Sequence, residues 1–88
     1  MNSYFFKKKI LITGASYGLG SVVAKKLASL GAELIITARS RDKLSKVLDN
    51  LENKGNHMLI VSDFQSDQSI KEMCDRIIKD FKKIDIIM

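Results

Sequence analysis

The fold of this 88-residue chain is decided by the stretch Ile10-Leu-Ile-Thr-Gly-Ala-Ser-Tyr-Gly-Leu-Gly20, where three glycines lie between a short apolar run and a helical pattern. Gly14 allows a sharp turn out of a strand, Gly18 leaves room for a ligand beside the backbone, and Gly20 lets the helix pack closely. The N–H groups of the first helical turn favour a phosphate or pyrophosphate. No Gly-Lys-Ser/Thr follows, which excludes a Walker A site. We therefore predict a phosphate-binding loop, with a tight turn that holds no ligand as the alternative.

Strand and helix patterns alternate along the rest of the chain. Apolar runs rich in β-branched residues predict strands over residues 9–13, 33–37, 57–61 and 84–88. Helical spacing predicts a first helix over 19–30 that stops at Gly31, a second ending near Gly55 and a third capped by Ser66 or Asp67. Continuous apolar strands in the order βαβαβαβ predict an α/β fold: a Rossmann-like parallel sheet, buried on both faces, with the glycine loop at the carboxyl end of the first strand.

The same spacing assigns a buried face to each helix. The predicted stripes are Leu19, Val22, Val23, Leu27 and Leu30 in the first helix, Leu44, Val47, Leu48 and Leu51 in the second, and Ile70, Met73, Ile77 and Phe81 in the third. Cys74 and Ile78 widen the third stripe, so we expect Cys74 to be a buried thiol.

Composition narrows the class of protein. Hydrophobic residues make up 45% and charged residues 28% of the chain, and no apolar run approaches the roughly 20 residues that span a bilayer. The start lacks a signal-peptide pattern, and one cysteine without a metal-binding spacing suits the reducing cytoplasm. Of the net charge of +5, residues 1–50 carry +6 and residues 51–88 carry −1, but without a long basic run or an aromatic platform this charge does not predict nucleic-acid binding.

The loop Thr13-Gly-Ala-Ser-Tyr-Gly-Leu-Gly20 resembles the TGxxxGxG cofactor loop of the short-chain dehydrogenase/reductase family. The resemblance extends over essentially the whole chain: Thr37-Ala-Arg-Ser40 stands where the family's second strand ends, and Asp63 stands where family members place an acid near the adenine ring. Ile84-Asp-Ile-Ile87 is similar to the opening of the fourth strand, which in the family runs into Asn-Asn-Ala-Gly. The resemblance implies a domain that binds NAD or NADP.

The end of the second strand indicates which of the two cofactors is bound. An NAD site needs a carboxylate there, about 20 residues beyond the glycine loop, to accept hydrogen bonds from the ribose hydroxyls. Ala38 takes that place and Arg39 follows, and a guanidinium can pair with the additional phosphate of NADP. Ser16 and Ser40 add hydroxyl donors, whereas Tyr17 stands where many NADP-dependent members have a basic residue. We predict NADP, the alternative for Arg39 being a solvated loop arginine.

The predicted cofactor-binding residues are Gly14, Ser16, Tyr17, Gly18, Leu19, Gly20, Arg39, Ser40, Asp63 and Phe64. Asp63 has two compatible uses, contact with the adenine and a turn ahead of Ser66. His57 is expected to open a strand, and neither it nor Cys74 is predicted to be a site.

The catalytic part of the family pattern is absent. The resemblance implies a serine, an asparagine and a Tyr-xxx-Lys pair downstream of the fourth strand, whereas Tyr4 and Tyr17 precede or lie in the cofactor loop. We therefore interpret residues 1–88 as a partial NAD(P)-binding domain, the amino-terminal third of a reductase cut in its fourth strand, without catalytic or metal-binding residues. The alternative is a stand-alone nucleotide-binding module or an inactive gene remnant. A fourth strand at the sheet edge predicts self-association.

Overall fold

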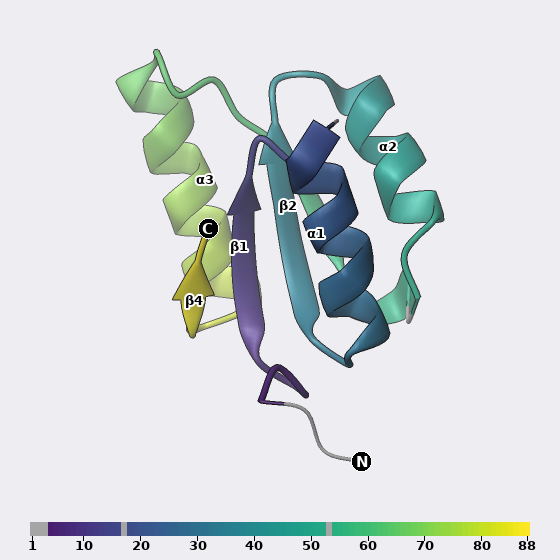
Figure 1. Ribbon diagram of the computed structural model, residues 1–88. Helices are drawn as coiled ribbons and strands as arrows, with labels where there is room; N and C mark the ends of the chain where they lie inside the picture. Colours follow the sequence, from purple (N-terminus) through teal and green to yellow (C-terminus); the bar gives the residue numbers. More distant parts are fainter. Residues whose placement is uncertain (1–3, 17, 53) are drawn as a thin grey trace.

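The computed structural model describes residues 4–16, 18–52 and 54–88 (Figure 1). Its elements are β1 (Lys9–Thr13), α1 (Gly18–Ser29), β2 (Glu33–Ala38), α2 (Arg41–Asp49), the 3-10 turn η1 (Lys54–Asn56), β3 (Met58–Val61), α3 (Asp67–Asp80) and β4 (Ile86–Ile87). The predicted βαβαβαβ order is confirmed.

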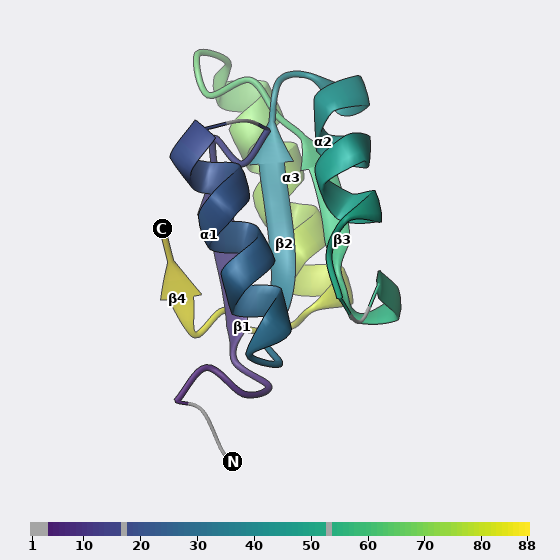
Figure 2. The ribbon, with the colours of Figure 1, turned by 45° about the vertical axis from the view of Figure 1, so that its right-hand side comes forward.

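All four strands form one parallel sheet in the order β3-β2-β1-β4. β1 is central and pairs with β2 in the register Lys9 to Glu33 through Thr13 to Thr37, and with β4 through Ile10 and Ile86. Figure 1 shows the carboxyl ends of β1 and β2 at the same edge of the sheet, and Figure 2 shows α1, which begins after the glycine loop at this edge, in front of β1. The Rossmann-like prediction is therefore correct.

Successive apolar residues along each strand point to opposite faces of the sheet. Ile10, Ile12, Leu34 and Ile36 point to the face that α1 and α2 cover, and Leu11, Ile35 and Ile60 point to the face that α3 covers. Most of these side chains are fully buried. The burial of both faces explains why the strands read as continuous apolar runs instead of alternating patterns.

The buried face of α1 differs from the prediction. Ala24, Leu27 and Ala28 are buried, whereas Leu19 is 79% and Val22 64% exposed. α1 begins close to the loop that precedes it. Small side chains therefore make part of the contact between this helix and the sheet. The prediction counted the large apolar residues of the helix and left out its alanines.

The helices α2 and α3 also depart in detail from expectation. α2 ends at Asp49 rather than near Gly55, because Asn50 caps it and donates its side-chain amide to the carbonyl of Lys46 (2.9 Å). Ser66 is the N-cap of α3, as one of the two predicted candidates.

Cys74 is exposed, and so is Ile78 at 65%, so the prediction of a buried thiol is wrong. The core takes a narrower stripe of α3 than the sequence suggested: Met73 and Ile77, one turn apart, are buried against the sheet, and each exposed residue is the next one along the helix.

His57 supports the sheet just before β3 begins. The N–H of Leu34 donates to His57 Nδ1 (3.0 Å), so the other ring nitrogen carries the proton and donates to the carbonyl of Glu52. The imidazole thus accepts a hydrogen bond from a backbone N–H of β2 at Leu34, one residue before the pairing of β2 with β3 begins. It has a structural use one residue before β3, which begins at Met58 and not at the predicted residue 57.

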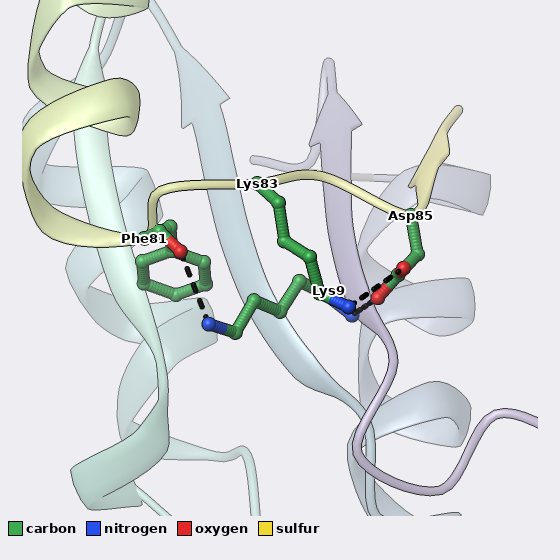
Figure 3. A network of polar contacts seen from close by, with 4 residues as sticks. All are labelled: Lys9, Phe81, Lys83 and Asp85. Carbon is green, nitrogen blue, oxygen red and sulfur yellow. Dashed lines mark hydrogen bonds and ion pairs between the residues drawn. The ribbon is translucent and has the colours of Figure 1, made fainter.

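The short β4 is held at both of its ends. Lys9 N–H donates to Asp85 Oδ2 (2.8 Å) and Lys9 Nζ donates to the carbonyl of Phe81 (3.0 Å), as Figure 3 shows. Asp85 N–H in turn donates to the carbonyl of Lys9 (2.8 Å). At the far end the N–H and hydroxyl of Thr13 both donate to the carbonyl of Met88. β4 is shorter than the predicted 84–88, yet its flanking residues continue the contacts with β1.

We expect the contribution of Asp85 to stability to depend on pH. The hydrogen bond from the Lys9 N–H is the main cause that holds the pKa of this carboxyl below its ordinary 3.8. Desolvation, the next effect in size, raises the pKa, and the nearby charges of Lys83 and Lys8 lower it. A pKa lower in the folded than in the unfolded state means that the stabilisation is complete above the unfolded value and is lost as the pH falls through the folded one.

Urea unfolding between pH 7 and pH 2 should therefore show a gap in stability between the protein and Asp85→Asn that closes only in the acid range. Asp75→Asn, on the exposed side of α3, is the control and should show a smaller gap at neutral pH. A gap for Asp85→Asn that does not change with pH would contradict the role given to its charge.

Candidate cofactor-binding site

The glycine loop is open where a ligand would need space and closed where the helix begins. Gly14 and Gly18 have φ angles of 64° and 60°, a region that side chains rarely adopt, and a Cβ on either would meet no atom within 4 Å. A Cβ on Gly20 would collide with the carbonyl oxygen of Gly14 and lie 3.1 Å from Ala15 Cα. The positive φ of Gly14 fits the predicted turn, and the surroundings of Gly18 are open, whereas the close approach at Gly20 is to the loop backbone and not to the sheet.

A cavity of about 370 Å³ lies at the carboxyl edge of the sheet, beside this loop. It is lined by Gly14, Ser16, Ala38, Arg39, Ser40, Lys43, Ser62, Asp63, Phe64 and Gln65. The residues come from the ends of β1, β2 and β3 and from the first turn of α2. The fold thus brings together three segments that lie far apart in the sequence.

Six of the ten predicted site residues line this one cavity: Gly14, Ser16, Arg39, Ser40, Asp63 and Phe64. Gly18, Leu19 and Gly20 form the first turn of α1 and are not among its lining residues. The N–H groups of that turn have no partners within the helix. Tyr17, also predicted, lies outside the described residues.

Arg39 and Ser40 follow directly on the end of β2. Arg39 is exposed, and the hydroxyl of Ser40 caps α2 by accepting the N–H of Lys43 (3.3 Å). Asp63 is the one carboxylate among the residues that line the cavity, and it belongs to the end of β3, not of β2. A ligand carrying negative charge therefore meets a cation where β2 ends.

Asp63 serves a turn at the end of β3. Its Oδ1 accepts the N–H of Gln65 (2.9 Å), its carbonyl accepts the N–H of Ser66 (2.9 Å), and its own N–H donates to Ser69 Oγ (2.8 Å). These bonds present the Asp63 side chain and the Phe64 ring, which is 45% exposed, at the cavity. The turn expected from the sequence is present, and it leaves contact with an adenine open as its second use.

Lys43, Ser62 and Gln65 line the cavity without having been predicted. The sequence could have indicated Lys43, because this residue stands four positions after Arg39, in the first turn of α2. Ser62 and Gln65 are neighbours of the predicted pair Asp63 and Phe64, at the carboxyl end of a strand, where such sheets bind ligands.

Comparison with known proteins agrees with this geometry. The profile of the family described as short chain dehydrogenase matches residues 8–88. The chain belongs to the short-chain dehydrogenase/reductase family. It is 38% identical to the NADPH-dependent pterin aldehyde reductase of Arabidopsis thaliana over 99% of its length and 36% of the relative's, and 31% identical to a glucose 1-dehydrogenase of Gluconobacter oxydans over 96% and 32%.

Solved structures of dehydrogenases share the fold. An apo-form glucose dehydrogenase of Caenorhabditis elegans superimposes with a TM-score of 0.86 at 29% identity, covering 97% of this chain and 38% of that one. NAD+-bound xylitol dehydrogenase gives 0.89 at 29% identity, covering 97% and 33%. The chain therefore spans about a third of the length of these members of the short-chain dehydrogenase/reductase family.

In the described part of the chain, no helix has both the length and the apolar character needed to cross a membrane. Across the same residues, nowhere do three or more histidine, cysteine, aspartate or glutamate side chains gather as metal ligands would.

We expect Gly20→Ala to damage the cofactor loop. Because the new methyl group would overlap the backbone of Gly14, the loop or α1 must shift, and overpacking of this kind costs about 1–3 kcal/mol. Gly55→Ala is the matched control, since a Cβ there meets no atom within 4 Å. Thermal unfolding and NADPH titration should show lower stability and weaker binding for Gly20→Ala than for Gly55→Ala. Equal behaviour of the two variants would show that the close approach at Gly20 is dispensable.

Proposed function

We propose that residues 1–88 form the NADP(H)-binding segment, the amino-terminal third, of a short-chain dehydrogenase/reductase. The whole enzyme would transfer a hydride between NADP(H) and a carbonyl or alcohol substrate, with the proton donor and the substrate pocket supplied by residues that this sequence does not contain. The observation that carries the proposal is Arg39, which lines the cavity beside the glycine loop directly after a β2 that ends in Ala38.

Arg39 favours NADP by charge and by shape. A carboxylate after β2 would accept the ribose hydroxyls of NAD and repel a phosphate on the same ribose, whereas a planar guanidinium offers paired donors to that phosphate. Relatives and structural neighbours include an NADPH-dependent reductase and an NAD+-bound dehydrogenase, so the proposal of NADP is supported by Arg39 and not by the relatives as a group.

The residues present fit a dinucleotide. The open space at Gly14 and Gly18 and the N–H groups at the start of α1 suit a pyrophosphate, and the cavity between the ends of β2 and β3 suits an adenosine. Ser16 and Ser40 supply hydroxyls there, and Asp63 and Phe64 form the adenine side. When bound, NADPH supplies the hydride, and this chain's residues bind and orient its adenosine half.

Self-association and a cytoplasmic location belong to the same proposal. Ile78 of α3, Ile87 of β4 and Met88 are exposed apolar residues, and β4 forms one edge of the sheet. Unpaired edges and apolar surface favour pairing with a second chain. A single free thiol, Cys74, suits a reducing compartment.

We expect Arg39→Asp to shift the preference from NADPH towards NADH. The substitution removes the cation that pairs with the phosphate and adds an acceptor for the ribose hydroxyls, so NADPH affinity should fall at least about tenfold while NADH affinity rises. Fluorescence titration with both nucleotides measures the change. Arg76→Asp, on α3, is the control for altered net charge. Unchanged affinities for both nucleotides would place Arg39 in solvent and remove the main support for NADP.

The 88-residue chain by itself should be inactive, marginally stable and self-associating. Carbonyl reduction needs a positioned proton donor, which the chain lacks, while NADPH at a hundredfold excess over its dissociation constant should still stabilise the fold by about 2.7 kcal/mol. NADPH oxidation with a panel of ketones and aldehydes, melting curves and sedimentation provide the measurements. Turnover by a stable monomer would overturn the interpretation as a segment. Failure of any nicotinamide nucleotide to raise the melting temperature would favour an inactive remnant.

A further inference from the structure

Two segments of the chain meet at the amino edge of the sheet, the edge opposite to the cofactor cavity. One is the turn over residues 4–7 that precedes β1, and the other is the loop over residues 81–85 between α3 and β4, as Figure 1 and Figure 2 show. The hydrogen bonds from Lys9 to Phe81 and Asp85 hold the second segment beside the start of β1 (Figure 3). Residues 76 positions apart in the sequence therefore belong to one surface.

The exposed side chains of this surface are aromatic and basic. Tyr4 is 71% and Phe6 51% exposed. Lys7 Nζ lies over the Phe6 ring, 5.5 Å from its centroid, and Lys8 Nζ lies over the Tyr4 ring at 5.1 Å. An aromatic ring has no net charge, so both ammonium groups remain uncompensated. We name this surface, together with two lysines of the second segment, the aromatic-lysine patch: Tyr4, Phe6, Lys7, Lys8, Lys82 and Lys83.

The positive charge of the patch is only partly balanced. Asp85 lies in the same loop as Lys83, with 3.6 Å between its Oδ1 and the lysine Nζ, and Glu33 begins β2 at the same edge of the sheet. Asp80, at the end of α3, pairs with Arg76 instead. Asp85 and Glu33 are fewer than the four lysines of the patch, so this surface attracts anions.

The backbone gives a second, independent indication of function at this surface. Lys7 and Lys82 have φ angles of 61° and 69°, and in the described part of the chain they are the residues other than glycine with a positive φ. This conformation is unfavourable for a residue with a Cβ, whereas glycine adopts it without that cost. Strained residues of this kind cluster at functional sites. Each segment of the patch thus has a lysine where glycine would suit the fold better.

Exposed rings beside ammonium groups suit the surface of a lipid bilayer. Aromatic rings and lysine stems lie at the boundary between headgroups and acyl chains, while the ammonium groups stay with anionic headgroups. A single-stranded nucleic acid would need open ring faces for stacking, and in the patch an ammonium group covers one face of each ring. An acidic protein segment would pair with the lysines but does not require the exposed rings.

From the placement of these rings and lysines we propose that the aromatic-lysine patch docks this protein on an anionic lipid surface. The inference is independent of the proposed function. Docking of this kind is peripheral and needs no segment that crosses the bilayer. Because the patch and the cofactor cavity lie at opposite edges of the sheet, the docked protein keeps its cavity open to the aqueous phase. The anionic lipids of a cytoplasmic leaflet supply the charge.

The test is flotation of the protein with vesicles, which separates bound protein from aggregates that sink. Vesicles of phosphatidylcholine with about 30% phosphatidylserine should carry the protein upward, and vesicles of phosphatidylcholine alone should not. Added salt should release the protein. Lys7→Gln/Lys82→Gln should bind roughly 25-fold more weakly, because each lysine near an anionic surface contributes about fivefold. Lys25→Gln/Lys71→Gln, at two exposed lysines outside the patch, removes the same charge and should bind as the protein does.

Single variants separate the ring and the backbone from the charge. Tyr4→Ala should bind more weakly, since the ring is lost from the interface, and Tyr4→Phe should retain the affinity. Lys7→Gly should melt at no lower temperature than the protein, because glycine fits the positive φ, and should still bind about fivefold more weakly. A lysine that served only the turn would leave the binding of Lys7→Gly unchanged.

Four results would overturn the inference. Equal flotation with and without phosphatidylserine, or equal weakening by the patch and the control double variants, would show unspecific adhesion. Unchanged binding by Tyr4→Ala would leave the rings without a role and remove the reason to prefer a lipid. Tighter binding of the patch to a polyglutamate peptide or to a single-stranded oligonucleotide than to the vesicles would assign it to an acidic protein or to a nucleic acid.

Discussion

The central position of β1 is the constraint on which the rest of this structure depends. The strand is hydrogen-bonded to β2 on one side and to β4 on the other, and both of its faces are covered. A strand in that position has a fixed register and a fixed direction, so the residue after Thr13 must leave the sheet at a defined point. Gly14 turns the chain there, and the open loop, the start of α1 and the cofactor cavity all follow from where that turn occurs.

Parallel strands place their carboxyl ends together, which concentrates polar residues at one edge of an otherwise apolar sheet. The ends of β2 and β3 bring Arg39 and Asp63 to the same cavity although 24 positions separate them in the sequence. Polar residues at the opposite edge of the sheet attach segments of the chain to one another. There, Lys9 and Asp85 join β4 to β1, and His57 satisfies a backbone group of β2. The cofactor cavity and these supports thus lie at opposite edges of one sheet.

Cationic side chains outnumber carboxylates among the described residues that line the cavity at the carboxyl edge of the sheet. Arg39 and Lys43 line the cofactor cavity, Asp63 is the one carboxylate among its described lining residues, and the hydrogen bond from Gln65 already engages that carboxylate. A lining with more cationic than acidic side chains suits a ligand with several negative charges. A nucleotide with an additional phosphate meets that requirement better than one without it.

The sequence by itself determined the order of elements, the parallel sheet with two buried faces and the glycine loop, because these depend on local periodicity and on glycine at particular positions. It also indicated six residues of the cavity, since the carboxyl ends of the strands can be located from the apolar runs. Packing decided the rest. The sequence overestimated the width of the buried faces of α1 and α3. Leu19, Val22, Cys74 and Ile78 belong to the predicted faces and are exposed. The distance between a helix and the sheet selects which side chains fit, and the periodicity of the sequence carries no information about that distance. The loop that carries Lys82 and Lys83 lies beside the start of β1 only because β4 pairs with β1, a relation between segments that no local pattern encodes.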